Sequence, residues 1–310
     1  MARIMMSTPQ RSTVEQIFNL YICSVTSEGV KDKTLATYKQ HFHAISKRLD
    51  VSKPIASLKS YHLDQMIQEM KDNGLSPRSI NSYTRTLKVF FSWCNREGYT
   101  DLNITIYKAP EAVKEIYTDD ELLTLLEKPK ADCNFCEYRN WTIVNFLLNS
   151  GCRAATVRNI QIQDVDLDQQ QIVLRHTKNG KLQVIPLCRS MVAILRDYME
   201  IRAGGRNEYL FCDEFGGFLT ENALRLAIRK YNTSRGVERT SIHAFRHSFA
   251  RKYLVDCGGD AFTLQKLMGH STLKMTRHYC NIFNSDLVEN HELHSPLAQM
   301  SRSKQKAIKK

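Results

Sequence analysis

The sequence predicts a mainly α-helical protein with a small antiparallel β-sheet, built as two domains. A chain of 310 residues is long enough for more than one hydrophobic core. Apolar residues recur at helical spacing over most of its length. Two apolar-rich segments, 171–176 and 182–187, flank Asn179-Gly180, which is a strong signal for a β-hairpin. We therefore expect helices throughout and a pair of strands in the second half.

Four amphipathic helices are predicted within residues 10–103. Ser12-Thr-Val-Glu15 has the form of a capping box, and Ser76-Pro77 is a helix cap followed by proline at the first helical position. The apolar stripes are Val14, Ile17, Phe18, Tyr21, Ile22 and Val25; Leu35, Tyr38, Phe42, Ile45 and Leu49; Leu63, Met66, Ile67 and Met70; and Ile80, Tyr83, Leu87, Phe90, Phe91 and Cys94. Short joints between such helices predict a small bundle.

A linker and a second domain follow the bundle. Residues 104–116 show no clear period and include Pro110, which suits an extended linker. Thr118-Asp-Asp-Glu121 is another capping box, so the second domain is expected over 117–290, with a basic tail at 291–310. Its helices are predicted at 138–149, 191–203, 220–231, 261–268 and 272–281, with Gly151 and Gly269 ending two of them. A further helix is predicted from His243 onward, broken by Gly258-Gly259.

Charge and cysteine usage narrow the class of partner. The 44 basic and 32 acidic residues leave a net charge of +12, which favours a polyanion, although a basic surface that only aids solubility is the alternative. No apolar run is long enough for a membrane span or a signal peptide, so we expect a cytoplasmic protein, in a bacterium one on the nucleoid. The nine cysteines are irregularly spaced, and Cys133-Asn-Phe-Cys136 lacks the second pair that a zinc site needs.

The stretch from His243 to Tyr279 concentrates side chains that suit a phosphate group. His243 and Arg246 are three residues apart, so on a helix they lie on one face. His270 follows Gly269, and Tyr279 comes nine positions later. Arginine offers a charged fork of donors, and histidine can donate or accept a hydrogen bond. The stretch therefore predicts a cationic, hydrogen-bonding site with a phenol in reach.

Five motifs occur in a fixed order along the second domain: Gly151-Cys-Arg153, Thr177-Lys178-Asn-Gly, His243-x-x-Arg246-His247, Leu267-Met-Gly269-His270, and Tyr279. In this order they resemble the motif set of the tyrosine recombinases, the phage-integrase family. The resemblance covers residues 12–290, because the helical bundle is similar to that family's core-binding, SAM-like domain. It implies a simple two-domain architecture of the Xer and Cre type, with a catalytic tyrosine recombinase domain in the second half.

The resemblance assigns roles to six residues: Arg153, Lys178, His243, Arg246, His270 and Tyr279. Tyr279 is the nucleophile, which forms a 3′-phosphotyrosine with DNA. The two arginines hold the non-bridging phosphate oxygens. Lys178 is the general acid, because the family's lysine lies eight residues before a strand proline, here Pro186, whereas Lys181 has the wrong offset.

The remaining histidines are given supporting roles by the same resemblance. His243 accepts from the tyrosine or hydrogen-bonds near it, and His270 donates to a phosphate oxygen. His247 and His278 flank these positions and are expected to be structural or to support them. No metal, cofactor or ATP is implied.

Two positions depart from the family pattern. The acidic residue that usually lies three after the first arginine is Thr156 here, so Arg153 would be held by Asp164 or Asp166, or held less firmly. The asparagine-proline pair common at the end of the fourth helix is Asn103-Ile104. These departures bear on the level of activity more than on its kind.

The resemblance also implies partners: double-stranded DNA recombination sites held in a C-shaped clamp, and a homotetramer formed by exchange of the C-terminal segment. A terminal helix packed on its own domain is the alternative. The implied function is integration or excision of a mobile element, with an excisionase or a DNA-bending protein as accessory partner. Alternatives are an Xer-like dimer resolvase, a catalytically weak DNA-binding regulator on the same fold, and a hydrolytic nuclease, which no carboxylate cluster supports.

Overall fold

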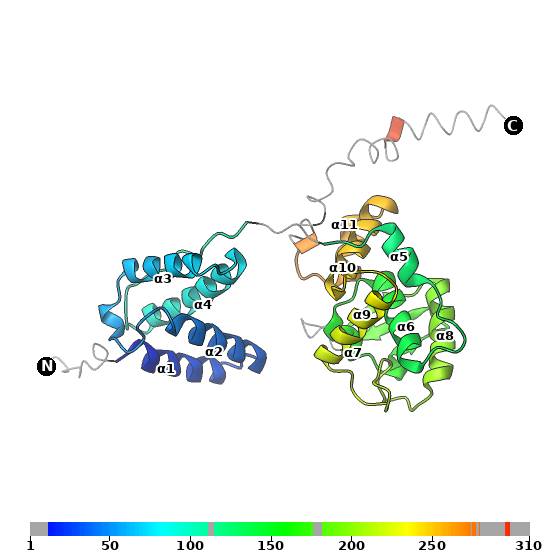
Figure 1. The fold of residues 1–310 in the computed structure, drawn as a ribbon, viewed down its shortest axis with the longest axis horizontal. Coiled ribbons are helices and arrows are strands. Elements are labelled where there is room, and N and C mark those ends of the chain that lie inside the picture. Colours follow the sequence, from blue (N-terminus) through cyan, green and yellow to red (C-terminus); the bar gives the residue numbers. More distant parts are fainter. Residues whose placement is uncertain are drawn as a thin grey trace. The chain divides into compact units, whose positions relative to one another are not determined.

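The computed structural model describes residues 12–110, 115–175, 182–273, 275–276, 279 and 295–297. The chain divides into two compact units, Met1–Val113 and Lys114–Lys310, which are described one at a time (Figure 1). The expected hairpin tip with Lys178, half of the expected helix 272–281 and most of the basic tail lie outside the described residues.

The first unit is a helical bundle, as predicted. Its described helices are α1 (Val14–Ser27), α2 (Asp32–Ser46), α3 (Ser60–Asp72) and α4 (Pro77–Arg96), with a short 3₁₀ turn, η2 (Ile55–Ser57). The apolar stripes of these helices form one core. Phe18 of α1 stacks on Phe42 of α2 with ring centroids 3.7 Å apart, and Phe90 of α4 meets Phe18 edge-on. The predicted periodicity therefore corresponds to buried faces.

The start of α1 differs from the prediction by one residue. Thr13 and Gln16 form the capping box, instead of Ser12 and Glu15. With Thr13 as the cap, Val14 opens the helix and is buried in the bundle core. Burial of the apolar stripe thus sets the helix register, and either hydroxyl could have served as the cap.

The first residues of the expected linker pack on the bundle. Ile104 is buried in the core of the first unit. The hydroxyl oxygen of Thr84 accepts a hydrogen bond from the backbone N–H of Tyr107 at 3.1 Å, and the Asn81 side chain donates to the Tyr107 carbonyl. Residues 104–107 thereby extend the first unit beyond α4.

The second unit is built around one buried helix, α6 (Phe135–Ser150). The other described helices are α5 (Asp119–Leu126), α7 (Ala154–Arg158), α8 (Arg189–Arg202), α9 (Glu221–Ser234), α10 (Ile242–Arg251) and α11 (Ala261–Met268). Helices α5, α8, α9 and α10 all pack against α6. Because α6 is buried nearly all round, its sequence shows little amphipathic pattern.

A small antiparallel sheet lies in the second unit. The strands β1 (Val165–Asp166), β2 (Gln171–Leu174) and β3 (Gln183–Pro186) pair in the order β1-β2-β3, after the short turn η3 (Ile162–Asp164). Ile172 pairs with Ile185, and both are buried. The predicted pairing of the two apolar segments is confirmed, and β1 is an addition that two residues were too few to predict.

The end of α10 and the start of α11 carry local features that place the site. Helix α10 changes at Lys252 into a π-helical turn, η4 (Lys252–Asp256), which ends just before Gly258, where the sequence predicts the break. The Asp260 carboxylate caps α11, and Gly269 ends it in the left-handed conformation, with φ of 60°. None of the described helices is long and apolar enough to cross a membrane.

Candidate active site

Helix α10 carries three of the side chains that the sequence analysis singled out. One face of α10, including Phe245, packs into the core, where the Phe245 ring stacks on Tyr117 with centroids 4.2 Å apart. Arg246 lies on the same turn and is only 5% exposed. His243 and His247, four residues apart, lie one turn from each other on the more exposed side. The core face of α10 therefore fixes the orientation of all three polar residues.

Arg246 is held by the ends of two helices. Its Nη1 donates to the carbonyl oxygen of Gly151, the C-cap of α6, at 2.6 Å. Its Nη2 donates to the carbonyl oxygen of Met268, the last residue of α11, at 3.0 Å, and to Nε2 of His270 at 2.7 Å. Helix C-termini carry partial negative charge and stabilise a cation. Burial and the nearby charge of Arg153 lower the pKa of Arg246 from its ordinary value.

The contacts of His270 fix its tautomer. A guanidinium only donates, so the His270 Nε2 that faces Arg246 accepts. The proton of a neutral ring is then on Nδ1, which donates to the hydroxyl oxygen of Thr276 at 2.8 Å. His270 is buried, and both of its ring nitrogens contact protein groups. To donate to a phosphate oxygen, as predicted, it must exchange one of these contacts.

The phenol of Tyr279 lies beside this group. Tyr279 is 5% exposed and belongs to a small apolar cluster with Phe249, Leu264 and Met268. Its ring is nearly parallel to that of His270, at 10° with centroids 6.0 Å apart. Burial raises the pKa of the Tyr279 phenol, and the charge of Arg246 and a hydrogen bond with it act in the opposite direction. The structure thus brings together Arg246, His270 and Tyr279.

The histidine that contacts the phenol is His247. Its Nδ1 lies 3.0 Å from the Tyr279 hydroxyl oxygen. The sequence analysis gave that contact to His243 and a supporting role to His247. The i to i+4 spacing of the two histidines on one helix was the signal that could have raised His247 as a candidate. Desolvation, Arg246 and Arg153 together lower the pKa of His243.

Arg153 is the N-cap residue of α7, three residues after Ser150, the last residue of α6. Within the described part of the chain its guanidinium has no hydrogen bond or ion pair, and its charge acts on Arg246, His243 and Tyr279. The expectation that Asp164 or Asp166 holds Arg153 is not supported.

Both candidate carboxylates have other partners. One oxygen of Asp164 pairs with Arg175 at 2.6 Å, and the other accepts the backbone N–H of Gln161. Asp166 accepts the backbone N–H of Gln169. The Arg175 guanidinium and nearby backbone N–H groups therefore occupy these carboxylates, and neither pairs with Arg153.

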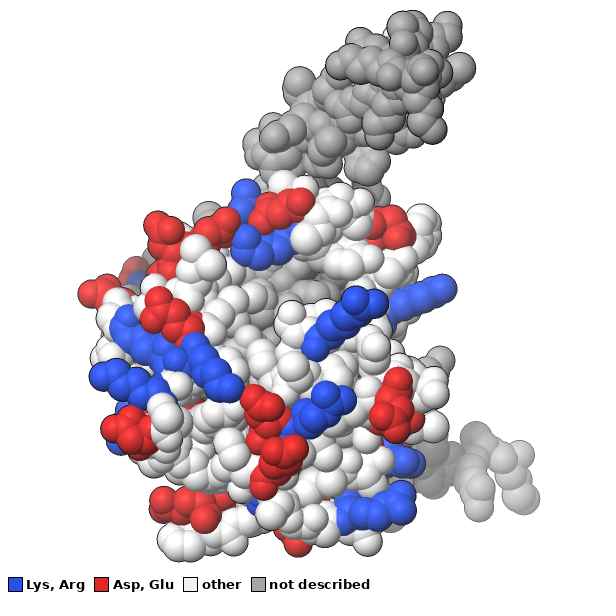
Figure 2. All heavy atoms as spheres, turned by 90° about the vertical axis from the view of Figure 1, so that its right-hand side faces the viewer, with Lys and Arg blue, Asp and Glu red and all other residues white. Residues whose placement is uncertain are grey.

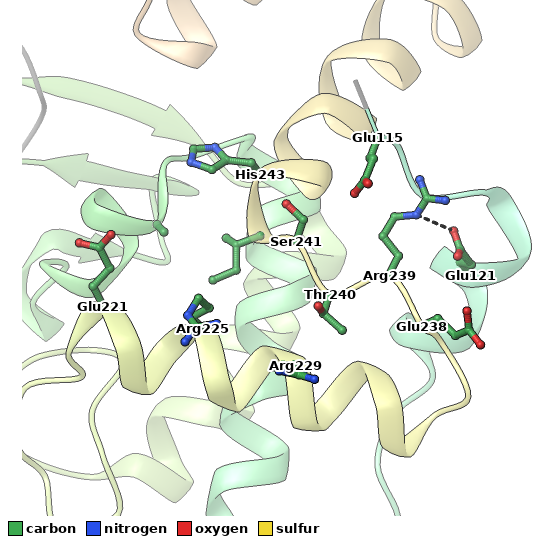
Figure 3. A pocket seen from close by; sticks show the side chains of 12 residues that line it. Glu115, Glu121, Glu221, Arg225, Arg229, Glu238, Arg239, Thr240, Ser241 and His243 are labelled. Carbon is green, nitrogen blue, oxygen red and sulfur yellow. Dashed lines mark ion pairs between the residues drawn. The ribbon is translucent and has the colours of Figure 1, made fainter. Parts of the chain in front are cut away.

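A cavity of about 680 Å³ opens beside His243 (Figure 3). It is lined by Glu115, Glu121, Ala154, Glu221, Arg225, Arg229, Glu238, Arg239, Thr240, Ser241, Ile242 and His243. Arg225 and Arg229 lie on α9, and Arg239 forms an ion pair with Glu121 at 3.7 Å. Basic and acidic side chains are also interspersed on the face of the second unit seen in Figure 2. Among the described residues, no cluster of acidic, histidine or cysteine side chains could hold a metal ion.

Two family models match the sequence. The model of the phage integrase family matches residues 115–285, and that of the phage integrase N-terminal SAM-like domain matches residues 21–98. The chain belongs to the phage integrase family. It is a tyrosine-type site-specific DNA recombinase, with a SAM-like helical domain followed by an integrase domain, so the predicted family and fold class are confirmed.

Curated relatives and solved structures agree with this membership. Tyrosine recombinase XerC of Thermodesulfovibrio yellowstonii is 26% identical over 289 residues, which cover 88% of this chain and 93% of the relative. XerA of Thermococcus kodakarensis is 30% identical over 224 residues, covering 70% and 76%.

Among solved structures, a lambda integrase dimer bound to a COC′ core site has a TM-score of 0.72 at 20% identity, covering 88% of this chain and 78% of the integrase. The Tn1549 transposon integrase in complex with transposon right end DNA has a TM-score of 0.71 at 22% identity, covering 86% and 94%. At these identities the likeness shows the shared fold.

Proposed function

We propose that this recombinase cleaves and rejoins double-stranded DNA with Tyr279 as the nucleophile. The observation that carries the proposal is the position of the Tyr279 hydroxyl, which lies 3.0 Å from His247 Nδ1 and interacts with the Arg246 guanidinium. A nucleophile needs a base on one side, and a phosphoryl group needs cations on the other. This phenol has both within reach.

The proposed cleavage step conserves one phosphoester bond. The Tyr279 oxygen forms a bond to the scissile phosphorus while the bond from phosphorus to the 5′ oxygen breaks, leaving a 3′-phosphotyrosine. The phenol proton passes to His247, and the departing 5′ oxygen takes a proton from Lys178. Because the phosphotyrosine retains the bond energy, a 5′ hydroxyl can attack it in the reverse reaction and reseal a strand without ATP.

Arg153 and Arg246 are proposed to bind the non-bridging oxygens of the scissile phosphate. Both guanidiniums act on Tyr279 electrostatically, so both lie near the position that the phosphorus must occupy. A fixed, permanently charged fork stabilises the extra negative charge of the transition state. His243 borders the same region, and His270 completes the group by contact with Arg246.

We further propose integration or excision of a mobile element as the biological role, with recombination sites as the DNA partner and an excisionase or DNA-bending protein as accessory. Solved relatives include a transposon integrase with transposon right end DNA. Dimer resolution of the Xer type is the second candidate, favoured by the match to XerC over 88% of this chain. Sequencing DNA trapped covalently on the protein in cells separates the two: element ends indicate integration, and one chromosomal locus indicates resolution.

A homotetramer is the proposed assembly, formed by exchange of the C-terminal segment. A lambda integrase tetramer bound to a Holliday junction has the same fold, with a TM-score of 0.72. Here the segment after Tyr279 lies outside the described residues apart from 295–297. Removal of residues 291–310 is expected to prevent assembly on two sites while one site is still bound.

The nucleophile is tested with a nicked suicide substrate, on which the cleaved strand cannot be resealed. Tyr279→Phe is expected to bind DNA and to form no covalent adduct, because phenylalanine lacks the attacking oxygen. Tyr253→Phe is the matched control, since Tyr253 packs against Phe249 in the same cluster, and it should still form the adduct. An adduct on Tyr279→Phe would contradict the proposal, and its complete absence from the wild type would favour a regulator without catalysis.

A further inference from the structure

The C-terminal end of α11 is held by a side chain from the sheet. The last carbonyls of a helix have no partner inside the helix. The Nε2 of Gln183, on β3, donates to the carbonyl oxygens of Lys266 and Leu267 at 2.9 and 2.7 Å. The next carbonyl, that of Met268, accepts from Arg246 at 3.0 Å. Consecutive carbonyls at this helix end are therefore divided between Gln183 and the buried arginine.

Gly269 leaves the space that Gln183 needs. A Cβ added to Gly269 would lie 2.4 Å from the Gln183 side-chain oxygen, which is too close for two atoms that are not bonded. Gly269 also has a φ of 60°, a conformation that favours glycine. The Gln183 amide thus lies directly against the turn that leads from α11 into His270.

The backbone of Gln183 is fixed in turn. It pairs with Leu174 across β2 and β3, and two positions further along the same strands the pair of Ile172 and Ile185 is buried in the core. A side chain on such a strand has little freedom to follow a movement of α11. Gln183 therefore ties the end of α11 to the sheet and, through Met268 and His270, to Arg246.

We propose that Gln183 is a positioning residue for the pair formed by Arg246 and His270. By holding the end of α11 against β3, it keeps the Met268 carbonyl and His270 Nε2 where they orient the Arg246 fork. Gln183 acts through these groups and does not touch the substrate, since its amide nitrogen already donates to two carbonyls. The inference rests on the proposed role of Arg246 in binding the scissile phosphate.

The test compares two nearly isosteric variants on the same sheet. Gln183→Met keeps the length of the side chain and removes the donor. Gln171→Met on β2 is the control, because Gln171 makes no side-chain hydrogen bond to the described residues. Strand cleavage is measured on a suicide substrate with an ordinary scissile phosphate and on one with a methylphosphonate, which replaces a charged oxygen by a methyl group. Melting temperature and DNA affinity are measured alongside.

A displaced arginine reduces the cleavage rate most when the scissile phosphate is charged. Gln183→Met is expected to slow cleavage of the ordinary substrate by roughly 10- to 100-fold, as misplacement near a reacting centre does. On the neutral methylphosphonate the loss should shrink to about twofold, because less charge needs to be stabilised. Gln171→Met should match the wild type on both. Equal loss by Gln183→Met on the two substrates, or no loss on either, would overturn the proposal.

Two further variants keep the outcome interpretable. Gln183→Glu has the same shape but, when ionised, can only accept, so it repels the carbonyls of Lys266 and Leu267; it should show the same substrate dependence with a larger loss. Arg246→Ala tests the premise. If Arg246→Ala slows cleavage equally on the charged and the neutral substrate, the proposed role of Arg246 is wrong. If Arg246→Ala shows the expected difference and only Gln183→Met slows cleavage equally on both, the positioning role alone is wrong.

Discussion

Replacing His247 with asparagine should show whether this histidine takes the proton of Tyr279, the proposed nucleophile. The asparagine amide can occupy the place of Nδ1, which lies 3.0 Å from the Tyr279 hydroxyl oxygen, so a hydrogen bond to the phenol can be kept. The amide cannot accept a proton at neutral pH. The substitution therefore separates orientation of the phenol from its deprotonation.

The size of the effect follows from the environment of the phenol. An unperturbed phenol with a pKa of about 10 is ionised in roughly one molecule in 300 at pH 7.5. Burial raises the pKa of Tyr279, which makes the phenolate rarer still. A positioned base typically contributes 10²- to 10⁴-fold. We expect His247→Asn to slow cleavage by about 100-fold at neutral pH, equivalent to about 2.7 kcal/mol in the barrier.

The assay is single-turnover cleavage of a suicide substrate over a range of pH. Without a protein base the phenolate must form by loss of a proton to solvent, so the rate of His247→Asn should rise about tenfold per pH unit, and its deficit should shrink as pH increases. His243→Asn is the comparison on the same helix and should keep the wild-type slope. A wild-type slope for His247→Asn, or the steep slope for His243→Asn, would return the role of base to His243.

Three further outcomes are expected. Arg246→Lys should lose about 3 kcal/mol in denaturant unfolding, because one ammonium cannot replace contacts to two carbonyls and a ring nitrogen. Lys178→Ala should abolish cleavage of ordinary DNA and recover it on a 5′-thiolate leaving group, which needs no acid; equal loss on both would refute that role. Because the pKa of His243 is lower in the native state than in the unfolded chain, the unfolded chain binds a proton more readily. The free energy of unfolding should therefore fall as pH drops below about 6.5. In thermal melts, the melting temperature of His243→Gln should fall less between neutral and acid pH than that of the wild type.

Local pattern was sufficient for most of the fold. The stripes that include Phe18, Phe42 and Phe90 identified the bundle, because amphipathic helices must bury one face. Prediction from the sequence failed where an element depends on contacts with residues outside its own segment. β1 has only two residues, and its pairing depends on β2, so no window of sequence distinguishes it from a turn. The π-helical turn after Arg251 likewise interrupts a continuous apolar pattern.

Three residues of the candidate site could be grouped from the sequence, but their contacts could not. Motif order brought Arg246, His270 and Tyr279 into one hypothesis. The Gly151 carbonyl that holds Arg246 lies 95 residues away along the chain, so only the packing of α6 against α10 reveals it. The choice between His243 and His247 depends on where the Tyr279 segment returns to α10, which helical spacing cannot specify. Gln183 belongs to no motif and becomes visible only through the end of α11.

The way the arginines are held explains why Thr156 in place of an acid is compatible with the proposed chemistry. Arg246 is fixed by two carbonyls and a neutral imidazole, and among the described residues neither it nor Arg153 has a carboxylate partner. Neutral acceptors orient a guanidinium without cancelling its charge, whereas an ion pair would offset part of it. The uncompensated charge is felt locally, since each arginine lowers the pKa of His243. If a phosphate diester binds here as proposed, it meets two cations that no carboxylate among the described residues neutralises, and it supplies the anion that pairs with them.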